Sequence, residues 1–419
     1  MNYKEIFPNG IKVVIEEIPS VRSVSIGIWV SVGSKDEKAK ENGISHFLEH
    51  MIFKGTKSKT ALAIAQTMDS IGGHVDAATG REHTCYYAKV MDKHLPTTIE
   101  LLADIFFNSV FNPVEIEKEK QVIVEEIKMY EDTPDELIHD LFAQTIWNTH
   151  PLGQPIWGNL NVIKDTTQDE LIKFWNTHYT PDEIVISVAG HVQKDEVISQ
   201  LFKFFNKHTG SKWRSKEAVP TFNSDSIFQF RKLEQIHLCL GTPGLPSIHE
   251  DRYILRILTT ILGIGMSSRL FQKIREESAL AYNVQAYPLS YKNAGALVVY
   301  AGVSPKNYKE TTGIILNEFN ALKTELVNEQ EILNAKEKLK SALWLNSEDT
   351  SYRMSRLAEQ EIYFDKLFSI EETIELIDKV NLTDIQRLAQ ELFKNEYLCL
   401  TTIGPLRKKD GEIDFESGV

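Results

Sequence analysis

Alternating apolar and polar residues at the start of the chain predict two half-buried strands. They cover residues 10–19 and 21–34, where apolar side chains fall at every second position. The spacing then changes to the repeat of an amphipathic helix over residues 40–54 and 60–71. A pair of glycines ends the second of these helices. The chain therefore opens with two strands followed by two helices.

The pattern continues with two more strands, two long helices and a later strand. Residues 74–90 alternate on both sides of Gly80, which predicts two strands joined by a turn. Helical spacing returns over residues 95–110 and 113–132, and residues 184–192 form a further apolar strand. Elements in this order predict an α+β fold, with a mainly antiparallel sheet and helices packed on one face.

The second half of the chain repeats the first in the same order and with similar spacing. Three pairs of segments match, namely 235–246 with 23–34, 306–322 with 93–110, and 328–343 with 112–127. This repetition predicts a duplicated unit of about 200 residues. We expect an N-terminal domain at residues 1–210, a polar linker at 211–225 and a homologous C-terminal domain at 226–419.

The composition fits a soluble globular protein, and the net charge argues against some classes of binding partner. Apolar residues make up 42% of the 419 residues and charged residues 25%, which is ordinary for globular domains. The net charge of −13 argues against nucleic acid or an anionic membrane as the main partner. No apolar run is long enough to span a membrane, and the first ten residues do not read as a signal peptide. We expect a cytoplasmic protein with three reduced cysteines, Cys85, Cys239 and Cys399.

Residues 43–56, GISHFLEHMIFKGT, place two histidines and a glutamate inside a helix that otherwise reads as buried. His46 and His50 are four residues apart, so they project from one helix face and can bind one ion together. Glu49 lies beside them, where it can reach a water molecule on the ion. This H-x-x-E-H order is the inverted form of a zinc-peptidase motif. Imidazole and carboxylate ligands suit zinc.

The alternative for this helix is a pair of hydrogen-bonded histidines in the core. The matching helix of the second half, residues 254–265, contains neither His nor Glu, so packing alone does not require them. This comparison favours a metal site. A structural zinc site would need a fourth protein ligand, and no cysteine lies near His46 in the sequence to supply one. Another divalent ion could replace zinc, since the order of affinities alone does not select the metal.

A third metal ligand is expected from the acidic helix at residues 113–132. Glu119, Ile123 and Glu126 follow one another at spacings of four and three, and Ile123 turns this stripe inward. Glu125 lies on a different stripe. Periodicity therefore favours Glu126 over Glu125 without excluding Glu125. Three further glutamates of this helix are expected on a solvated face: Glu115, Glu117 and Glu131.

These residues resemble the pitrilysin/insulysin family of metallopeptidases, which includes the mitochondrial processing peptidase. The segment HFLEHMIFKGT is similar to the zinc motif of that family almost letter for letter. The resemblance implies one zinc ion per chain, bound by His46, His50 and Glu126. It also implies that Glu49 is the catalytic general base, and that Glu119, seven residues before the third ligand, supports the site.

The segment GGHVDAATGREHTCYY is similar to the substrate-binding segment of the same family. By resemblance, its first strand is an exposed sheet edge to which a substrate peptide adds, mainly through backbone groups. The residues that would pair with the peptide are Val75, Asp76, Ala77, Ala78 and Thr79. Asp76 stands where the family usually has asparagine.

The second half carries a further family signature, IREESALAYNV, in which Arg275 and Tyr282 are seven residues apart. In the family, such an arginine and tyrosine contact the substrate and stabilise the oxyanion. Some family members divide the zinc motif and the Arg/Tyr motif between two different subunits, whereas this chain contains both. The resemblance therefore implies a homodimer that encloses a cavity.

The sequence thus predicts a zinc metalloendopeptidase that hydrolyses short or unfolded peptides inside a closed chamber, by water activated on zinc with Glu49 as general base. Two alternatives come from the same family. One is a subunit of the processing-peptidase type that needs a different partner chain. The other is a non-catalytic structural relative, a class that has usually lost the zinc residues that this chain keeps.

Overall fold

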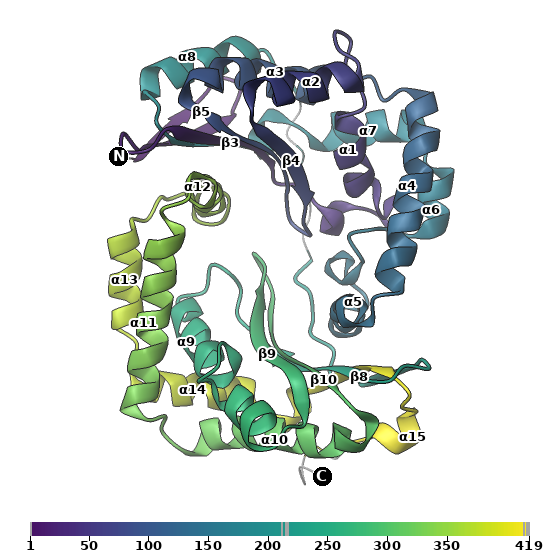
Figure 1. Cartoon of the computed structure of the whole chain (residues 1–419), viewed down its shortest axis with the longest axis vertical. Helices are drawn as coiled ribbons and strands as arrows, with labels where there is room; N and C mark the ends of the chain where they lie inside the picture. Colours follow the sequence, from purple (N-terminus) through teal and green to yellow (C-terminus); the bar gives the residue numbers. More distant parts are fainter. Residues whose placement is uncertain (1, 211–212, 214–217, 414, 416–419) are drawn as a thin grey trace. The chain divides into compact units, whose positions relative to one another are not determined.

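Two compact units make up the protein, each built around one sheet (Figure 1). The structure, a computed structural model, describes residues 2–210, 213, 218–413 and 415. The first unit contains residues 1–129, 154–217 and 345–367, and the second contains residues 130–153, 218–344 and 368–419. Much of the predicted linker, residues 211–212 and 214–217, lies outside the described residues.

The sheet of the first unit has its substrate-binding candidate at one edge. Its strand order is β1-β2-β6-β3-β5-β4, and β4 pairs with β5 alone. Only β2 and β6 are parallel neighbours, so the sheet is mainly antiparallel, as predicted. The strands are β1 (Asn2–Ile6), β2 (Lys12–Glu17), β3 (Ser23–Val30), β4 (His74–Thr79), β5 (Thr84–Met91) and β6 (Ile184–Gly190).

Helices cover one face of this sheet and enclose the larger apolar core of the unit (Figure 1). Side chains of α1, α3 and α8 pack in that core against alternate residues of the strands, because successive strand residues point to opposite faces. The helices that follow the chain through this unit are α1 (Ile44–Ile52), α2 (Ala61–Ile71), α3 (Leu95–Asn108), α4 (Pro113–Glu131), α6 (Leu160–Asp165), α7 (Gln168–His178) and α8 (Lys194–Phe205).

The sheet of the second unit repeats the topology of five of the six strands of the first, with no counterpart of β1 among the described strands. Its order is β7-β11-β8-β10-β9, and only β7 and β11 run parallel, as β2 and β6 do in the first sheet. This repetition is what the predicted duplication requires. The strands are β7 (Ile227–Phe230), β8 (Ile236–Pro243), β9 (Ala281–Ser290), β10 (Gly295–Val303) and β11 (Cys399–Gly404). The helices that belong to it are α9 (Arg252–Gly263), α10 (Tyr308–Thr324), α11 (Glu329–Asn346), α13 (Ile370–Asp378), α14 (Leu382–Leu392) and α15 (Lys408–Gly411).

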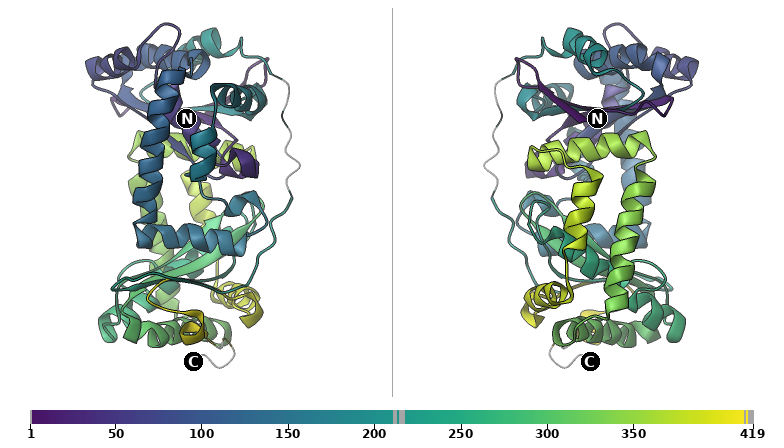
Figure 2. Two further views of the ribbon diagram at one scale, coloured as in Figure 1. Left: turned by 90° about the vertical axis from the view of Figure 1, so that its right-hand side faces the viewer. Right: turned by 90° about the vertical axis from the view of Figure 1, so that its left-hand side faces the viewer.

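Each sheet also carries one helix that comes from the other half of the sequence. Helix α12 (Thr350–Phe364) lies on the face of the first sheet opposite its main core (Figures 1 and 2). Its Met354 and Leu357 form one apolar cluster with Trp29 of β3. Helix α5 (Pro134–Ile146) packs in the same way on β8 and β11 of the second sheet. The compact units therefore differ from contiguous domains at 1–210 and 226–419 by these exchanged helices, and helices occupy both faces of each sheet.

Ion pairs fasten α12 to the first sheet. The carboxylate of Glu361 is fully buried and lies 2.9 Å from Lys4 Nζ and 2.8 Å from Lys12 Nζ. Arg353 forms a further ion pair with Glu16 on β2. Because a buried carboxylate is costly without such partners, these lysines help to fix the helix on this sheet. Within the described residues, no helix has both the length and the apolar character that crossing a membrane requires.

Candidate metal centre

Helix α1 carries the first two candidate ligands. Its apolar residues pack in the core, so the face with the two histidines lies toward α4. Phe47, Leu48 and Met51 are buried in the main core of the first unit and fix the opposite face of the helix. The helix starts at Ile44 and not at residue 40, because Gly43 adopts a left-handed φ of 100° as its N-cap. His46 and His50, one turn apart, consequently lie side by side, with their rings 4.7 Å apart.

A buried carboxylate caps the start of this helix. Glu37 accepts hydrogen bonds from the backbone N–H of Gly43 at 2.7 Å and of Ser45 at 2.8 Å, and from Asn42 Nδ2 at 3.1 Å. These bonds satisfy helix N–H groups that would otherwise lack a partner. Burial raises the pKa of Glu37 to about 7, although each of the three donors favours its ionised form. The cap sets the position from which the two histidines project.

Helix α4 supplies the third candidate ligand. Ile116, Ile123 and Ile127 of α4 are buried in the core of the first unit. Glu126 lies between Ile123 and Ile127 in the sequence of this helix. Its Oε2 lies 3.5 Å from His50 Nε2 and 3.8 Å from His46 Nε2. His46, His50 and Glu126 form the one group in the described chain whose ligand atoms converge as a metal site requires. The structure therefore brings together the three ligands that the resemblance implied.

The choice between Glu125 and Glu126 follows from the side that each occupies. Glu125 is 73% exposed and pairs with Lys128 at 2.7 Å on the outer face of α4. Glu126 points to the histidines. Glu115 and Glu117 likewise pair with lysines of the same helix, and the side chain of Glu131 is exposed. The predicted solvated face matches the structure at Glu117 and Glu131, whereas Glu115 is half-buried.

The donor set and its spacing fit a zinc ion. Nitrogen ligands bound about 2.0–2.1 Å from a tetrahedral zinc lie about 3.3–3.4 Å from each other. The Nε2 atoms of His46 and His50 are 3.3 Å apart. Three protein ligands leave a fourth position for water or substrate, as in catalytic zinc sites. The described residues place no fourth protein ligand in the group, and none of the three buried cysteines belongs to it.

The charges around the site prepare the two histidines differently. Burial lowers the pKa of His46 to about 4, so this ring is neutral at pH 7 and can donate a lone pair to a metal. Burial alone would also lower the pKa of His50, but the carboxylates of Glu126 and Glu119 raise it above its ordinary value. The hydrogen bond from His50 lowers the pKa of Glu126. Both carboxylates therefore favour positive charge at the centre.

Glu119 supports the site from behind His50. Its Oε2 lies 3.1 Å from His50 Nδ1, on the side of the ring away from Glu126. Glu119 and Glu126 are seven residues apart, which is two helical turns, so both lie on one face of α4. Metal-binding histidines commonly donate their second N–H to such a carboxylate. Glu119 therefore lies beside a candidate ligand, and its supporting role stays a prediction.

Glu49 lies on α1, and its side chain contacts the edge strand β4. The hydroxyl of Thr79, the last residue of β4, donates a hydrogen bond to Glu49 Oε2. Burial raises the pKa of the Glu49 carboxyl, and this hydrogen bond opposes the rise. The sequence predicted Thr79 as a backbone partner for a peptide, but not this side-chain contact. The alternation along β4 could have predicted that Thr79 points inward, but not that its hydroxyl contacts Glu49.

The five residues predicted to bind substrate lie on β4. The strand has exposed and half-buried residues in alternation, and it forms the edge of the first sheet. Val75 and Ala77 belong to its half-buried side, whereas Asp76 and Ala78 are exposed. The Asp76 carboxylate contacts its own strand, accepting from the N–H of Ala77 at 2.8 Å. The predicted exposed edge is present, and peptide binding there stays a prediction.

Arg275 and Tyr282 belong to the second unit and contact each other. Arg275 lies in a π-helical segment, Phe271–Glu277, and Tyr282 is near the start of β9 with 79% of its surface exposed. The Arg275 guanidinium carbon is 4.6 Å from the centre of the Tyr282 ring and 4.8 Å from that of Phe271. The structure thus groups the two residues of this motif, and their role in a site with His46 stays a prediction.

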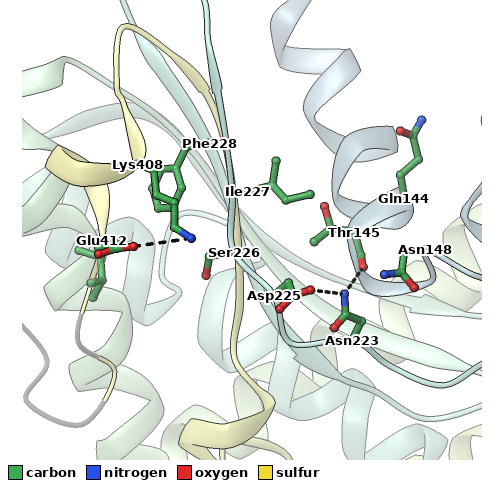
Figure 3. Close-up of a pocket in the computed structure, with 11 residues that line it drawn as sticks. Gln144, Thr145, Asn148, Asn223, Asp225, Ser226, Ile227, Phe228, Lys408 and Glu412 are labelled. Atoms are coloured by element: carbon green, nitrogen blue, oxygen red, sulfur yellow. Dashed lines mark hydrogen bonds and ion pairs between the residues drawn. The ribbon is translucent and has the colours of Figure 1, made fainter.

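A polar cavity of about 820 Å³ also lies in the second unit (Figure 3). Several of its polar groups are paired with each other. Asn223 Nδ2 donates to Asp225 Oδ2 at 3.1 Å and to the carbonyl of Thr145 at 3.2 Å, and Lys408 lies 3.7 Å from Glu412. We assign no function to this cavity, since its charged groups already have partners.

Comparison with known proteins identifies the family. Residues 12–159 match the family model described as insulinase (peptidase family M16), and residues 165–339 match the one described as peptidase M16 inactive domain. The chain is 42% identical over 397 residues to the uncharacterized zinc protease YmxG of Bacillus subtilis, covering 95% of this chain and 97% of that one. This protein belongs to peptidase family M16. The resemblance seen in the sequence is thereby confirmed.

Other relatives and solved structures agree with this assignment. The M16 protein is 35% identical over 410 residues to the uncharacterized zinc protease SCO5738 of Streptomyces coelicolor, covering 96% of this chain and 89% of that one. A protease structure from Helicobacter pylori superposes with a TM-score of 0.91 at 21% identity, over 97% and 99% of the two chains. A chain of complex III2 from Candida albicans gives a TM-score of 0.86 at 19% identity, over 99% and 98%. The last two likenesses establish the fold, and the predicted α+β class is confirmed.

Replacing Glu126 by glutamine should remove tight zinc binding, because a neutral amide is a weak zinc ligand. We expect the zinc affinity to fall by about 100-fold or more. Loss of a residue that only hydrogen-bonds a metal ligand typically lowers the affinity by about 10- to 100-fold. Titration of the metal-free protein against a chromophoric chelator measures this change. The neighbouring Glu125→Gln variant is the control and should bind zinc like the unaltered protein. Equal losses in both variants would contradict the assignment of Glu126.

Proposed function

We propose that this M16 protein is a zinc-dependent endopeptidase that hydrolyses short or unfolded peptides, with one zinc ion per chain held by His46, His50 and Glu126. The observation that carries the proposal is the convergence of these ligand atoms beside Glu49, on a helix next to an exposed sheet edge. A metal site, a half-buried carboxylate and a place for an extended peptide are thus adjacent. These are the parts that metal-assisted peptide hydrolysis needs.

The substrate peptide is bound as an additional strand on β4. Because β5 is the one neighbour of β4 among the described strands, the backbone groups on the other side of β4 can form a ladder with an extended peptide. Ala77 and Ala78 have small side chains and restrict the approach of the peptide little. Backbone recognition of this kind accepts many sequences, which suits short or unfolded substrates.

Glu49 serves as the general base. Zinc at this centre would lower the pKa of a water molecule and polarise the scissile carbonyl. Glu49 accepts the proton of the attacking water and later transfers it to the leaving amine. Thr79, at the end of β4, holds one oxygen of the Glu49 carboxylate by a hydrogen bond. The strand that binds the peptide therefore also positions the general base. Glu119 fixes the ring of His50 from the other side.

Arg275 and Tyr282 stabilise the oxyanion in this proposal. A guanidinium and a phenol are strong donors to a developing negative charge, and the exposed Tyr282 ring is free to meet a substrate. The proposal also includes a closed chamber, a homodimer and a cytoplasmic location.

Replacing Glu49 by glutamine should keep the zinc and abolish most turnover. Glutamine has nearly the same shape but cannot accept the proton, and general base catalysis commonly contributes about 100- to 10,000-fold. Hydrolysis of a quenched fluorescent peptide, together with the zinc content of the same sample, measures both properties. The exposed Glu117→Gln variant is the matched control and should keep full activity. An active Glu49→Gln enzyme would refute the role of this residue.

Replacing Thr79 by valine should lower kcat more than it changes KM. Valine keeps the size of the side chain and the backbone of β4, but it removes the hydroxyl that holds Glu49. Hydrogen bonds to charged groups contribute about 1.5–3 kcal/mol, which corresponds to roughly a 10- to 100-fold loss of rate. Steady-state kinetics of Thr79→Val and Thr79→Ser test this, and serine should restore most of kcat. A rise of KM at unchanged kcat would show that Thr79 acts only in peptide binding.

The first alternative, a processing-peptidase-like subunit, differs in its partner. Sedimentation of the active species decides between them: a homodimer has twice the chain mass, whereas such a subunit is inactive until a different chain is added. The second alternative, a non-catalytic relative, draws on the fold shared with the complex III2 chain. The complete set of His46, Glu49, His50 and Glu126 in one place argues against it.

A further inference from the structure

A lysine just beyond α1 contacts the carboxylate behind the metal centre. Lys54 follows the C-terminal end of α1, where its backbone N–H donates to the carbonyl of Met51 at 3.1 Å. Its Nζ lies 2.7 Å from Oε1 of Glu119 on α4. The side chain of Lys54 is 32% exposed, whereas that of Glu119 is only 6% exposed. A cation thus reaches from the surface to a buried carboxylate.

Glu119 uses its two oxygens for two different partners. Oε1 contacts Lys54, and Oε2 lies 3.1 Å from His50 Nδ1. A buried carboxylate needs a partner at each oxygen, since an unpaired charge in the interior is costly. With Lys54 on one oxygen, the other is held toward the imidazole and can accept its N–H. Lys54, Glu119 and His50 therefore form a continuous chain of polar contacts that ends at the metal centre.

The Lys54–Glu119–His50 contacts select which nitrogen of His50 faces the metal. When Nδ1–H donates to Glu119, Nε2 keeps its lone pair on the side of His46 and Glu126. His46 is held differently. In the described part of the chain its Nδ1 has no hydrogen-bond partner, and the Trp157 ring packs against the imidazole at 5.4 Å. The orientation of His50 therefore depends on hydrogen bonding, whereas that of His46 depends on packing.

We propose that Lys54 is a positioning residue for the zinc ligand His50 and acts on it through Glu119. The inference rests on the proposed zinc centre and deepens it. The Lys54 ammonium contacts the Glu119 oxygen that faces away from His50. It raises the affinity for zinc by holding the Glu119 carboxylate in the orientation that fixes the ring of His50.

A nearby lysine provides a matched control. Lys59 lies in the same loop after α1 and pairs with Asp104 on α3, with Nζ 3.7 Å from Oδ2. Its side chain is 30% exposed, close to the value for Lys54. Asp104 also accepts from Thr56 at 2.8 Å and Ser58 at 2.7 Å, so this pair anchors the loop. Lys59→Met thus removes a similar charge and ion pair without touching Glu119.

The experiment measures zinc affinity and metal-free stability in the full-length protein. Metal-free samples of the unaltered protein, Lys54→Met, Lys54→Arg and Lys59→Met are titrated with zinc against a chromophoric chelator. Thermal unfolding of the same metal-free samples is recorded in parallel. We expect Lys54→Met to bind zinc about 10- to 100-fold more weakly, the range found for residues behind metal ligands. Lys54→Arg should recover most of the affinity, and Lys59→Met should change it by less than about threefold.

Two results would overturn the inference. One is a Lys54→Met variant that binds zinc as tightly as the unaltered protein. The other is a loss of affinity that is equal in Lys54→Met and Lys59→Met and follows a lower Tm of the metal-free protein, as a general effect on the fold would produce. A His50→Ala variant in the same series separates this inference from the proposed function. If His50→Ala keeps full zinc affinity, the metal centre itself is wrong; if it loses zinc and Lys54→Met does not, only the role of Lys54 is wrong.

Discussion

The two nitrogens of the His50 ring connect the helices that form the candidate metal centre. Glu119 lies 3.1 Å from Nδ1 and Glu126 lies 3.5 Å from Nε2, and both carboxylates come from one face of α4. The ring can take this position because the apolar side of α1 is buried and Glu37 caps its first turn. Packing, capping and the two-turn spacing on α4 thus act on the same side chain. A shift of either helix would separate Glu126 from the histidines.

The same helix also joins the metal centre to the edge of the sheet. Glu49 lies on α1 between the two histidines in sequence, and it accepts a hydrogen bond from Thr79 at the end of β4. The second unit repeats the sheet and its edge strand, but its helix α9 is apolar where α1 has histidines. Duplication of the fold therefore did not duplicate the candidate metal ligands of α1.

Much of this arrangement could be predicted from the sequence because short-range spacing determines it. His46 and His50 must share a helix face, and the buried Ile123 turns Glu126 rather than Glu125 inward. Other features depend on which elements meet. The apolar stripes of α5 and α12 indicate that each helix packs against a sheet, but not against which one. The packing of α5 on the second sheet and of α12 on the first could therefore not be predicted. The hydroxyl of Thr79 and the ammonium of Lys54 find their carboxylates only after the helices and the edge strand have packed.

The most direct test of the central claim is the hydrolysis of a quenched fluorescent peptide mixture by the purified protein before chelation, after chelation and after zinc is restored. The account predicts that activity falls when the metal is removed and returns with about one zinc ion per chain, since His46, His50 and Glu126 form a single three-ligand group in the described chain. Activity that persists without metal would contradict it. So would a protein that binds zinc at this centre and hydrolyses no peptide either alone or with another chain.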